Sequence, residues 1–175
     1  DNPDSIHQFL KQHVHLDTAR RQLVQIYIEQ KQFKAASELC SEAIVKYENQ
    51  LLPGLVIQYR KLLLEIARQA NDTDAVLRLA EELLLEGQDT QYYDLLRDMI
   101  SDDDWNNFVK GLIETVKTKA RPHMRVGLLG HIYIEEKMWT ELIKLAQQTG
   151  IRTLIRYEQF LHPNYPEECC EIYKE

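Results

Sequence analysis

The chain has 175 residues, of which 44% are hydrophobic and 28% are charged, ordinary proportions for a soluble folded protein. Its net charge of −7 argues against nucleic-acid binding, because that binding gains most of its affinity from basic side chains that neutralise phosphates. No apolar run approaches the roughly 20 residues needed to cross a bilayer, so we expect no membrane-spanning segment.

The first half of the chain predicts five helices. Asp4 and Ser5 can cap the first, and the segment 16–18 ends it and begins the second. Leu52-Pro53-Gly54 is the first clear break, and proline is tolerated in a first helical turn, so we expect the fourth helix from about Leu55 to Ala70. The polar segment 71–74 begins the fifth. The third helix carries apolar residues at i, i+3, i+4, i+7 and i+8, the spacing of a buried helix face: Ala36, Leu39, Cys40, Ala43 and Ile44.

The second half predicts further helices separated by clear breaks. Gly87 ends the fifth helix, and Arg121-Pro122 and Gly150 separate later ones. The acidic segment 101–104 resembles a divalent-ion site, but acids at a helix N-terminus also satisfy its free N–H groups and its dipole, and we favour that interpretation. No segment shows sustained strand alternation, so we expect an all-α fold of about ten or eleven helices.

We expect residues 1–175 to form a single helical-repeat domain. The chain begins at Asp1 without methionine or a signal-like apolar stretch, and it stops at Glu175 inside a helical pattern, so we expect it to be a fragment of a longer protein. Its three cysteines form no disulfide framework, since Cys169 and Cys170 are neighbours and Cys40 lies on a predicted core face. This usage favours a reducing intracellular setting, and we expect a cytoplasmic protein.

One stretch of the chain occurs twice. The sequence from Leu23 to Phe33 returns from Leu129 to Trp139, with the shared string Ile-Tyr-Ile-Glu-[Gln/Glu]-Lys followed after one residue by an aromatic ring. Two weaker copies lie between them, and the residues that start the second helix of each copy are Phe33, Thr73, Trp105 and Trp139. Spacings between 30 and 40 residues suit a helix pair with its turns, so we expect a repeat architecture.

The repeated stretch resembles the tetratricopeptide repeat. The Leu-Gly pair of that family matches Leu129-Gly130, its first-helix tyrosine matches Tyr27 and Tyr133, and its first small residue in the second helix matches Ala36. The chain departs from the family pattern at the corner between helices, where the family's glycine is replaced by Lys31, Asn71, Asp103 and Lys137. The resemblance implies a right-handed α-solenoid of antiparallel helix pairs, in which neighbouring repeats stack around a continuous core.

The same resemblance implies a partner-binding surface. In the family, certain positions of each first helix face the concave side, and here they map to Arg21, Gln25, Lys61, Arg68, Tyr93, Arg97 and His131, together with Ile28, Glu29, Glu65 and Glu135. Four of these side chains would form a basic stripe suited to a carboxylate-bearing or phosphorylated peptide: Arg21, Lys61, Arg68 and Arg97. The alternative is that they are ordinary solvated charges on helix surfaces.

Neither a catalytic nor a metal site is predicted. His13 and His15 are two residues apart and so point to different sides of a helix, and Cys169-Cys170 lacks the spacing of a zinc ribbon. We find no nucleophile elbow, phosphate-binding loop or dinucleotide fingerprint. Paired acids such as Glu81-Glu82 are adjacent in sequence and therefore do not share a helix face. We therefore expect no enzyme and no cofactor.

The last third of the chain carries a second resemblance. The strings Tyr-Ile-Glu-Glu-Lys-x-Trp at 133–139, Ile-Arg-Tyr-Glu at 155–158 and Tyr-Pro-Glu-Glu at 165–168 are similar to the helical region that follows the zinc finger in bacterial SWIM zinc-finger proteins. The C-x-C and C-x-H ligands of that finger are absent from this chain, so no metal-binding residue is carried over.

The sequence therefore predicts a non-enzymatic protein–protein interaction scaffold that binds a protein or peptide. The alternative is a nucleic-acid-associated accessory region of a larger zinc-finger protein, which the second resemblance favours and the net charge disfavours. A third interpretation is a structural spacer that has no stable partner.

Overall fold

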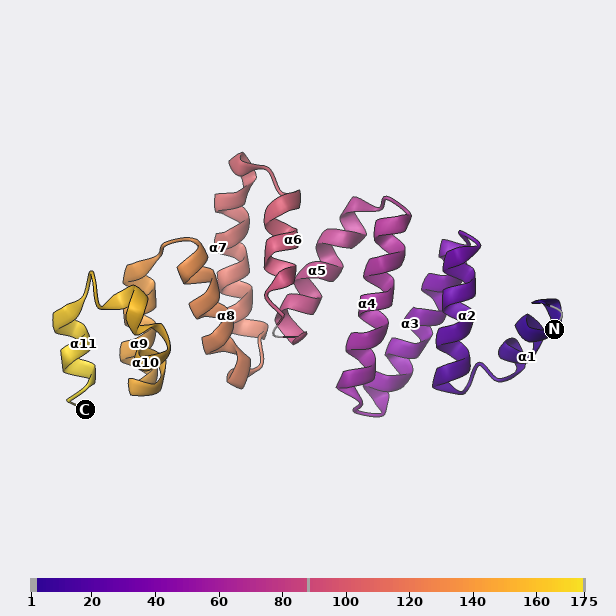
Figure 1. Ribbon diagram of the computed structural model, residues 1–175, viewed down its shortest axis with the longest axis horizontal. Helices are drawn as coiled ribbons and strands as arrows, with labels where there is room; N and C mark the ends of the chain where they lie inside the picture. The colour runs from indigo at the N-terminus through magenta and orange to yellow at the C-terminus, as the bar shows by residue number, and fades with distance from the viewer. Residues whose placement is uncertain (1–2, 88, 175) are drawn as a thin grey trace. The chain divides into compact units, whose positions relative to one another are not determined.

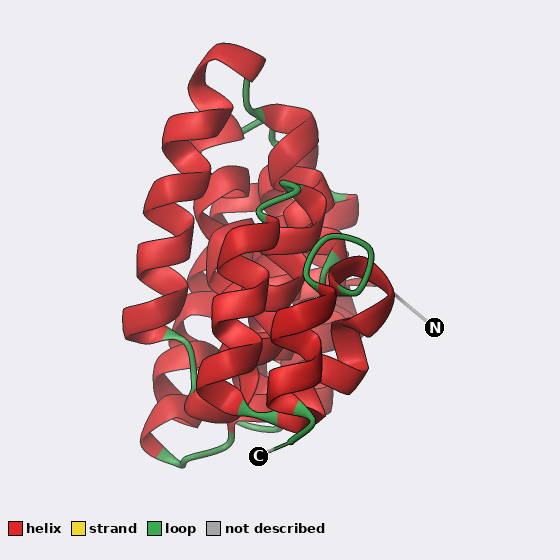
Figure 2. Cartoon of the chain, turned by 90° about the vertical axis from the view of Figure 1, so that its left-hand side faces the viewer, coloured by secondary structure: helices red, strands yellow, loops and turns green. Residues whose placement is uncertain are grey.

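The computed structural model describes residues 3–87 and 89–174, and every regular element in these ranges is a helix (Figure 2). This confirms the predicted all-α class. Eleven helices follow one another along the described part of the chain: α1 (Pro3–Gln12), α2 (Asp17–Glu29), α3 (Phe33–Asn49), α4 (Pro53–Gln69), α5 (Thr73–Gly87), α6 (Gln91–Met99), α7 (Asp102–Lys119), α8 (Pro122–Glu135), α9 (Trp139–Thr149), α10 (Ile151–Leu161) and α11 (Pro166–Ile172).

Five of the eleven described helices begin for local reasons that the sequence showed. Proline occupies the first turn of α4, α8 and α11, where its missing N–H has no partner to lose. Ser101 caps α7 by accepting from the Asp104 backbone N–H, and the three acids of the first turn lie at the positive end of the helix. Asp72 similarly accepts from the N–H of Ala75 at 3.0 Å. The first helix differs from expectation, because α1 begins at Pro3 and so includes Asp4 and Ser5.

Four turns between helices share one backbone geometry. Lys31, Leu51, Asn71 and Lys137 are the non-glycine residues with positive φ in the described ranges, all between 55° and 57°. In each turn the N–H of the next residue bonds a carbonyl five positions back, for example Gln32 to Tyr27 at 2.8 Å. This is the pattern of a left-handed helix cap, the position that glycine favours. Three of the four predicted corners therefore adopt a glycine-like conformation. The fourth does not, because Asp103 lies in the first turn of α7. The remaining left-handed residue, Leu51, lies in the turn between α3 and α4.

The repeated stretch has the same helical boundaries in both copies. Helix α2 ends at Glu29 and α8 ends at Glu135, while α3 begins at Phe33 and α9 begins at Trp139. Both pairs of boundaries are separated by 106 residues, the offset between the two copies in the sequence. The sequence repeat is therefore a repeat of helix, turn and helix.

The chain divides into two compact units, one ending at Leu83 and one beginning at Leu84. In the first unit, α2 packs against α3 and α3 against α4 (Figure 1). Its main core gathers apolar side chains from all three helices, of which Val24, Ala36, Cys40, Ala43 and Tyr59 are completely buried. A smaller cluster of Leu10, Ala19 and Leu23 fixes α1 to α2.

In the second unit, α8 packs against α7, α9 and α10. Gly130 permits the contact with α10, because a Cβ at this position would lie 2.2 Å from the Tyr157 hydroxyl oxygen. The small residue of the Leu-Gly pair therefore has a physical role, since it admits an aromatic ring against the backbone of α8. In the first unit, the position of Gly130 is taken by Val24, which is itself completely buried.

Candidate functional site

The predicted partner-binding residues of the first unit lie on α2 and α4. All four are exposed: Arg21, Gln25, Lys61 and Arg68. Arg21 forms an ion pair with Asp17 at 2.8 Å and donates to the amide oxygen of Gln58 at 3.1 Å, so it joins α2 to α4. Lys61 and Arg68 are separated by two helical turns and so lie on the same side of α4. The structure therefore brings the polar faces of α2 and α4 together around Arg21.

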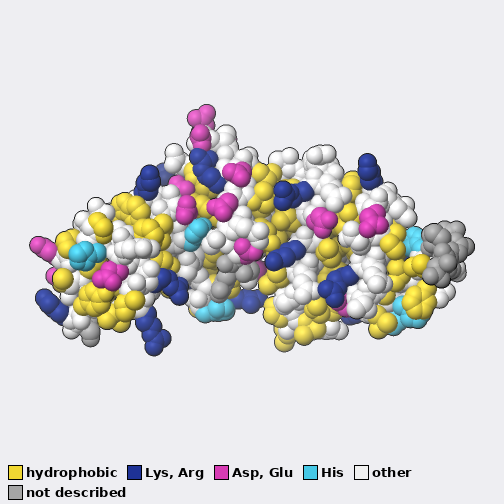
Figure 3. All heavy atoms as spheres, viewed as in Figure 1, with side chains coloured by type: hydrophobic (Ala, Val, Ile, Leu, Met, Phe, Trp, Pro, Cys, Tyr) yellow, Lys and Arg dark blue, Asp and Glu magenta, His cyan; other side chains and the backbone are white. Residues whose placement is uncertain are grey.

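This surface carries charges of both signs. Figure 3 shows Lys and Arg side chains interspersed with Asp and Glu side chains over this part of the chain. Glu65 lies between Lys61 and Arg68 on the same side of α4, and Glu29 follows Gln25 on α2 and accepts from its amide at 3.3 Å. Ile28, which the sequence mapping placed on the open side, is buried in the core instead. We call this surface the mixed stripe, because the acids Glu29 and Glu65 lie among the basic residues Arg21, Lys61 and Arg68. It therefore differs from the basic stripe that the sequence mapping predicted.

The predicted residues of the second unit come together around Trp105. We define the Trp105 cluster as Tyr93, Arg97, Trp105, His131 and Glu136. The Tyr93 ring is roughly perpendicular to the rings of Trp105 and His131, with centroids 5.5 Å and 5.2 Å away. The Arg97 guanidinium lies 5.0 Å from the Trp105 centroid. Arg97 also pairs with Asp102.

The centre of the Trp105 cluster is a single carboxylate oxygen. Glu136 Oε1 accepts a hydrogen bond from the Tyr93 hydroxyl at 2.6 Å and another from Trp105 Nε1 at 2.8 Å. Burial, and then the bond to Glu136, raise the pKa of Tyr93. Only 2% of Tyr93 is exposed, which corrects the expectation that it faces an open surface. The cluster thus fastens α6, α7 and the end of α8 together, and Arg97 is its exposed member.

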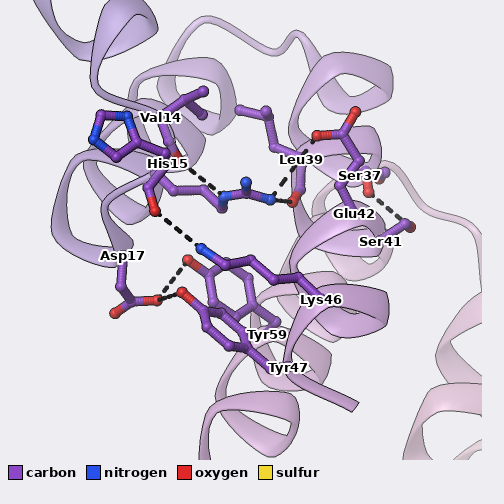
Figure 4. Close-up of polar contacts among 11 residues, drawn as sticks. Val14, His15, Asp17, Ser37, Leu39, Ser41, Glu42, Lys46, Tyr47 and Tyr59 are labelled. Carbon is purple, nitrogen blue, oxygen red and sulfur yellow. Dashed lines mark hydrogen bonds and ion pairs between the residues drawn. The ribbon is translucent and has the colours of Figure 1, made fainter. Parts of the chain in front are cut away.

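A partly buried polar network lies beneath the mixed stripe and is joined to it through Asp17, the ion-pair partner of Arg21 (Figure 4). One oxygen of Asp17 accepts from the hydroxyls of Tyr47 and Tyr59, at 3.0 Å and 2.9 Å, which ties α2 to α3 and α4. Arg20 is only 7% exposed and donates to the backbone carbonyls of Val14 and Leu39. The sequence did not predict these roles of Asp17 and Arg20. Their partners are 19 to 42 positions away or are backbone atoms, which leave no pattern in the sequence.

The first unit also has a groove that the sequence did not predict. A groove of about 520 Å³ runs between α3 and α5 above α4, and we call it the α3–α5 groove. Its lining is Phe33, Lys34, Ser37, Ser41, Ile44 and Val45 of α3, Arg60, Leu63, Ile66, Ala67 and Ala70 of α4, and Asp72, Ala75, Arg78, Leu79 and Glu82 at α5. Several of these apolar residues are only half-buried, and Val45 is 59% exposed. Val45, an apolar residue on the open side of a predicted helix, was the one feature of the sequence that could have indicated the groove.

The charged groups of the groove are partly paired with one another. Arg60 bridges Glu48 and Glu82 at 3.0 Å and 3.3 Å, and Arg78 shares Glu82 at 3.0 Å. Asp72 is occupied as the cap of α5. The acids that line the groove are therefore engaged by the chain itself, and Lys34 adds an exposed positive charge at the rim.

The α3–α5 groove and the mixed stripe occupy opposite sides of α4. Groove residues 60, 63, 67 and 70 follow one another at helical spacing, as do stripe residues 61, 65 and 68. With 3.6 residues per turn, the two sets point in roughly opposite directions. Substitutions on one side of α4 can therefore be used to test that side alone.

Other site chemistries find no support in the described residues. In residues 3–87 and 89–174, no three His, Cys, Asp or Glu side chains gather in an arrangement that could hold a metal ion. The rings of His13 and His15 are 6.1 Å apart, and His13 stacks on Phe9. Over the same residues, no helix combines the length and the apolar character that a membrane crossing requires.

Comparison with known proteins identifies no relative. No family model matches the chain, and neither the curated proteins nor the solved structures contain a match.

Proposed function

We propose that this chain is a non-enzymatic protein-interaction scaffold built from helical repeats of the tetratricopeptide type. The observation that carries the proposal is the α3–α5 groove, a hollow of about 520 Å³ lined by both apolar and charged side chains. Its floor is apolar and its rim is charged, the combination that receives an amphipathic helix. In the described ranges, no group of His, Cys, Asp and Glu side chains that could hold a metal ion competes with this role.

The occupant proposed for the groove is a helical segment of a partner protein, with apolar anchors and an acidic flank. Apolar anchors match the half-buried side chains of Phe33, Ile44 and Leu63. An acidic flank matches the rim, because three basic residues line the groove against two acidic ones. Arg60 and Arg78 share the carboxylate of Glu82, and the exposed Lys34 supplies the remaining positive charge. The mixed stripe on the other side of α4 is the competing surface.

The test is a selection of peptides from a displayed library against the purified chain, followed by calorimetric titration of the best binder. Val45→Glu and Lys34→Glu alter exposed positions of the groove, and we expect each to weaken binding by about tenfold or more, equivalent to about 1.4 kcal/mol. The matched control is Lys61→Glu with Arg68→Glu, on the opposite side of α4, which should leave the affinity within about twofold.

The possible results separate the two surfaces. Loss of binding in the Lys61→Glu, Arg68→Glu variant with no loss in the groove variants would transfer the interaction to the mixed stripe. If binding survives in all variants, or if the library gives no saturable binder, the scaffold proposal fails. Circular dichroism of every variant confirms that the helices remain formed.

A further inference from the structure

A smaller pocket lies in the second unit, between α8 and α10. Its volume is about 240 Å³, less than half that of the α3–α5 groove. We call it the α8–α10 pocket, and its lining is Thr90, His123, Met124, Gly127, Leu128, Arg156 and Tyr157. None of these residues belongs to the Trp105 cluster, and none takes part in the proposed peptide groove.

The base of the α8–α10 pocket is apolar. Met124, Leu128 and Tyr157 are all buried, and each belongs to the core of the second unit. Gly127 leaves the backbone of α8 bare at this point, and a Cβ added there would lie 3.8 Å from a terminal nitrogen of Arg156. The Arg156 guanidinium therefore lies over the glycine, at the wall of the pocket.

The charge of the pocket is opposite to that of the protein. Arg156 and His123 line it and no acidic residue does, although the chain as a whole carries a net charge of −7. Among the described residues, no carboxylate forms an ion pair with Arg156. His123 and Met124 belong to the first turn of α8, whose positive dipole end adds to the same potential.

From these features we propose that the α8–α10 pocket binds an oxyanion carried on a short apolar stem. The guanidinium would grip two oxygens, the Thr90 hydroxyl and the His123 ring would contribute further hydrogen bonds, and the stem would contact Met124 and Leu128. A phosphate monoester and a carboxylate share this chemistry. The proposal goes beyond the scaffold function and does not depend on it, because the groove and its peptide play no part.

Methionine labelling gives a direct test. The chain has three methionines, Met99, Met124 and Met138, and of these only Met124 lines the pocket. In protein labelled with ¹³C at the methionine methyl groups, phenyl phosphate should shift the Met124 signal saturably with a Kd below about 10 mM and leave the other two in place. Benzoate and inorganic phosphate, titrated separately, decide between a carboxylate and a phosphate and show what the apolar stem contributes. Benzyl alcohol is the uncharged control and should cause no saturable shift.

The matched variants are on α10. Arg156→Gln should weaken phenyl phosphate binding by about tenfold or more, whereas Arg152→Gln, one turn earlier and outside the pocket, should change it by less than about twofold. Gly127→Leu should block the pocket and abolish the Met124 shift. Equal weakening by the two arginine variants would show only non-specific attraction of anions and would overturn the proposal. So would the absence of a saturable Met124 shift with all three anionic probes in the unaltered protein.

Discussion

Leu51 shows how a single residue can store conformational strain in this fold. It has a φ of 56°, although a side chain with a Cβ is destabilised in the left-handed region by about 1–2 kcal/mol. Its side chain is 84% exposed, so it recovers little of that energy by packing. Its neighbour Leu52 has an ordinary φ of −108°.

We therefore expect Leu51→Gly to stabilise the first unit by about 1 kcal/mol, because glycine adopts this conformation without a Cβ penalty. Urea denaturation followed by circular dichroism measures the change. Leu52→Gly is the matched control and should destabilise, since it adds backbone entropy to the unfolded chain and relieves no strain. A destabilising effect of both substitutions would contradict the left-handed assignment at Leu51.

The corner residues also show what sequence reasoning can reach at this scale. Lys31, Asn71 and Lys137 were identified as corner residues from the repeated stretch, and each has the positive φ that glycine favours. Tyr93 was misplaced by the same alignment. Its burial depends on Trp105 and His131, which come from other helices, and helical spacing within α6 contains no information about them.

At the scale of helices, the packing of α8 against α10 depends on one missing side chain. Gly130→Ala would place a Cβ 2.2 Å from the Tyr157 hydroxyl, so the ring or the helix must move. Overpacking of this kind costs about 1–3 kcal/mol. We expect that loss of stability in the second unit, measured by urea denaturation.

The control for this prediction is a glycine in open space on another helix. Gly111 lies in α7, and a Cβ added there would meet nothing within 4 Å in the described part of the chain outside its own helix. Gly111→Ala should therefore stabilise by about 0.5–1 kcal/mol through helix propensity alone. If the two substitutions change the free energy of unfolding by similar amounts, Gly130 is not needed for the packing of α8 against α10. The Tyr157→Phe variant provides a second check, because removing the hydroxyl should relieve part of the strain in Gly130→Ala.

Helix boundaries were the most predictable part of the fold, and the grooves were the least. Pro53, Pro122, Ser101 and Asp72 act locally, so the sequence around them is sufficient to place a helix start. The α3–α5 groove depends instead on how much of α4 its neighbours leave uncovered. Leu63 and Ile66 lie on α4, and only the packing of α3 and α5 shows that they line a hollow.

At the scale of the whole molecule, three thiols report on the folded state. Cys40 lies in the core of the first unit and Cys169 is buried in the second, whereas Cys170 is exposed. Burial raises the pKa of the Cys40 thiol to about 12, with Arg20 opposing the shift. A raised pKa keeps the thiol protonated as the pH rises, and the thiolate is the reactive form.

We expect iodoacetamide at pH 8 to modify Cys170 first and Cys40 last, with Cys40 slower by about a thousandfold or more from its lowered thiolate fraction and restricted access. Mass spectrometry of tryptic peptides over time measures the order. Urea should abolish the difference, which separates protection by folding from intrinsic reactivity. Rapid modification of Cys40 in native buffer would show that the core around α3 is not closed.

The division of the chain into two units has an optical consequence. Both tryptophans belong to the second unit, Trp105 beneath the Arg97 guanidinium and Trp139 stacked against Phe160 with a centroid separation of 6.3 Å. The first unit contains tyrosines but no tryptophan. Indole fluorescence, excited selectively, therefore reports on the second unit alone, and the intrinsic emission of the chain provides a dye-free signal for the state of its C-terminal half.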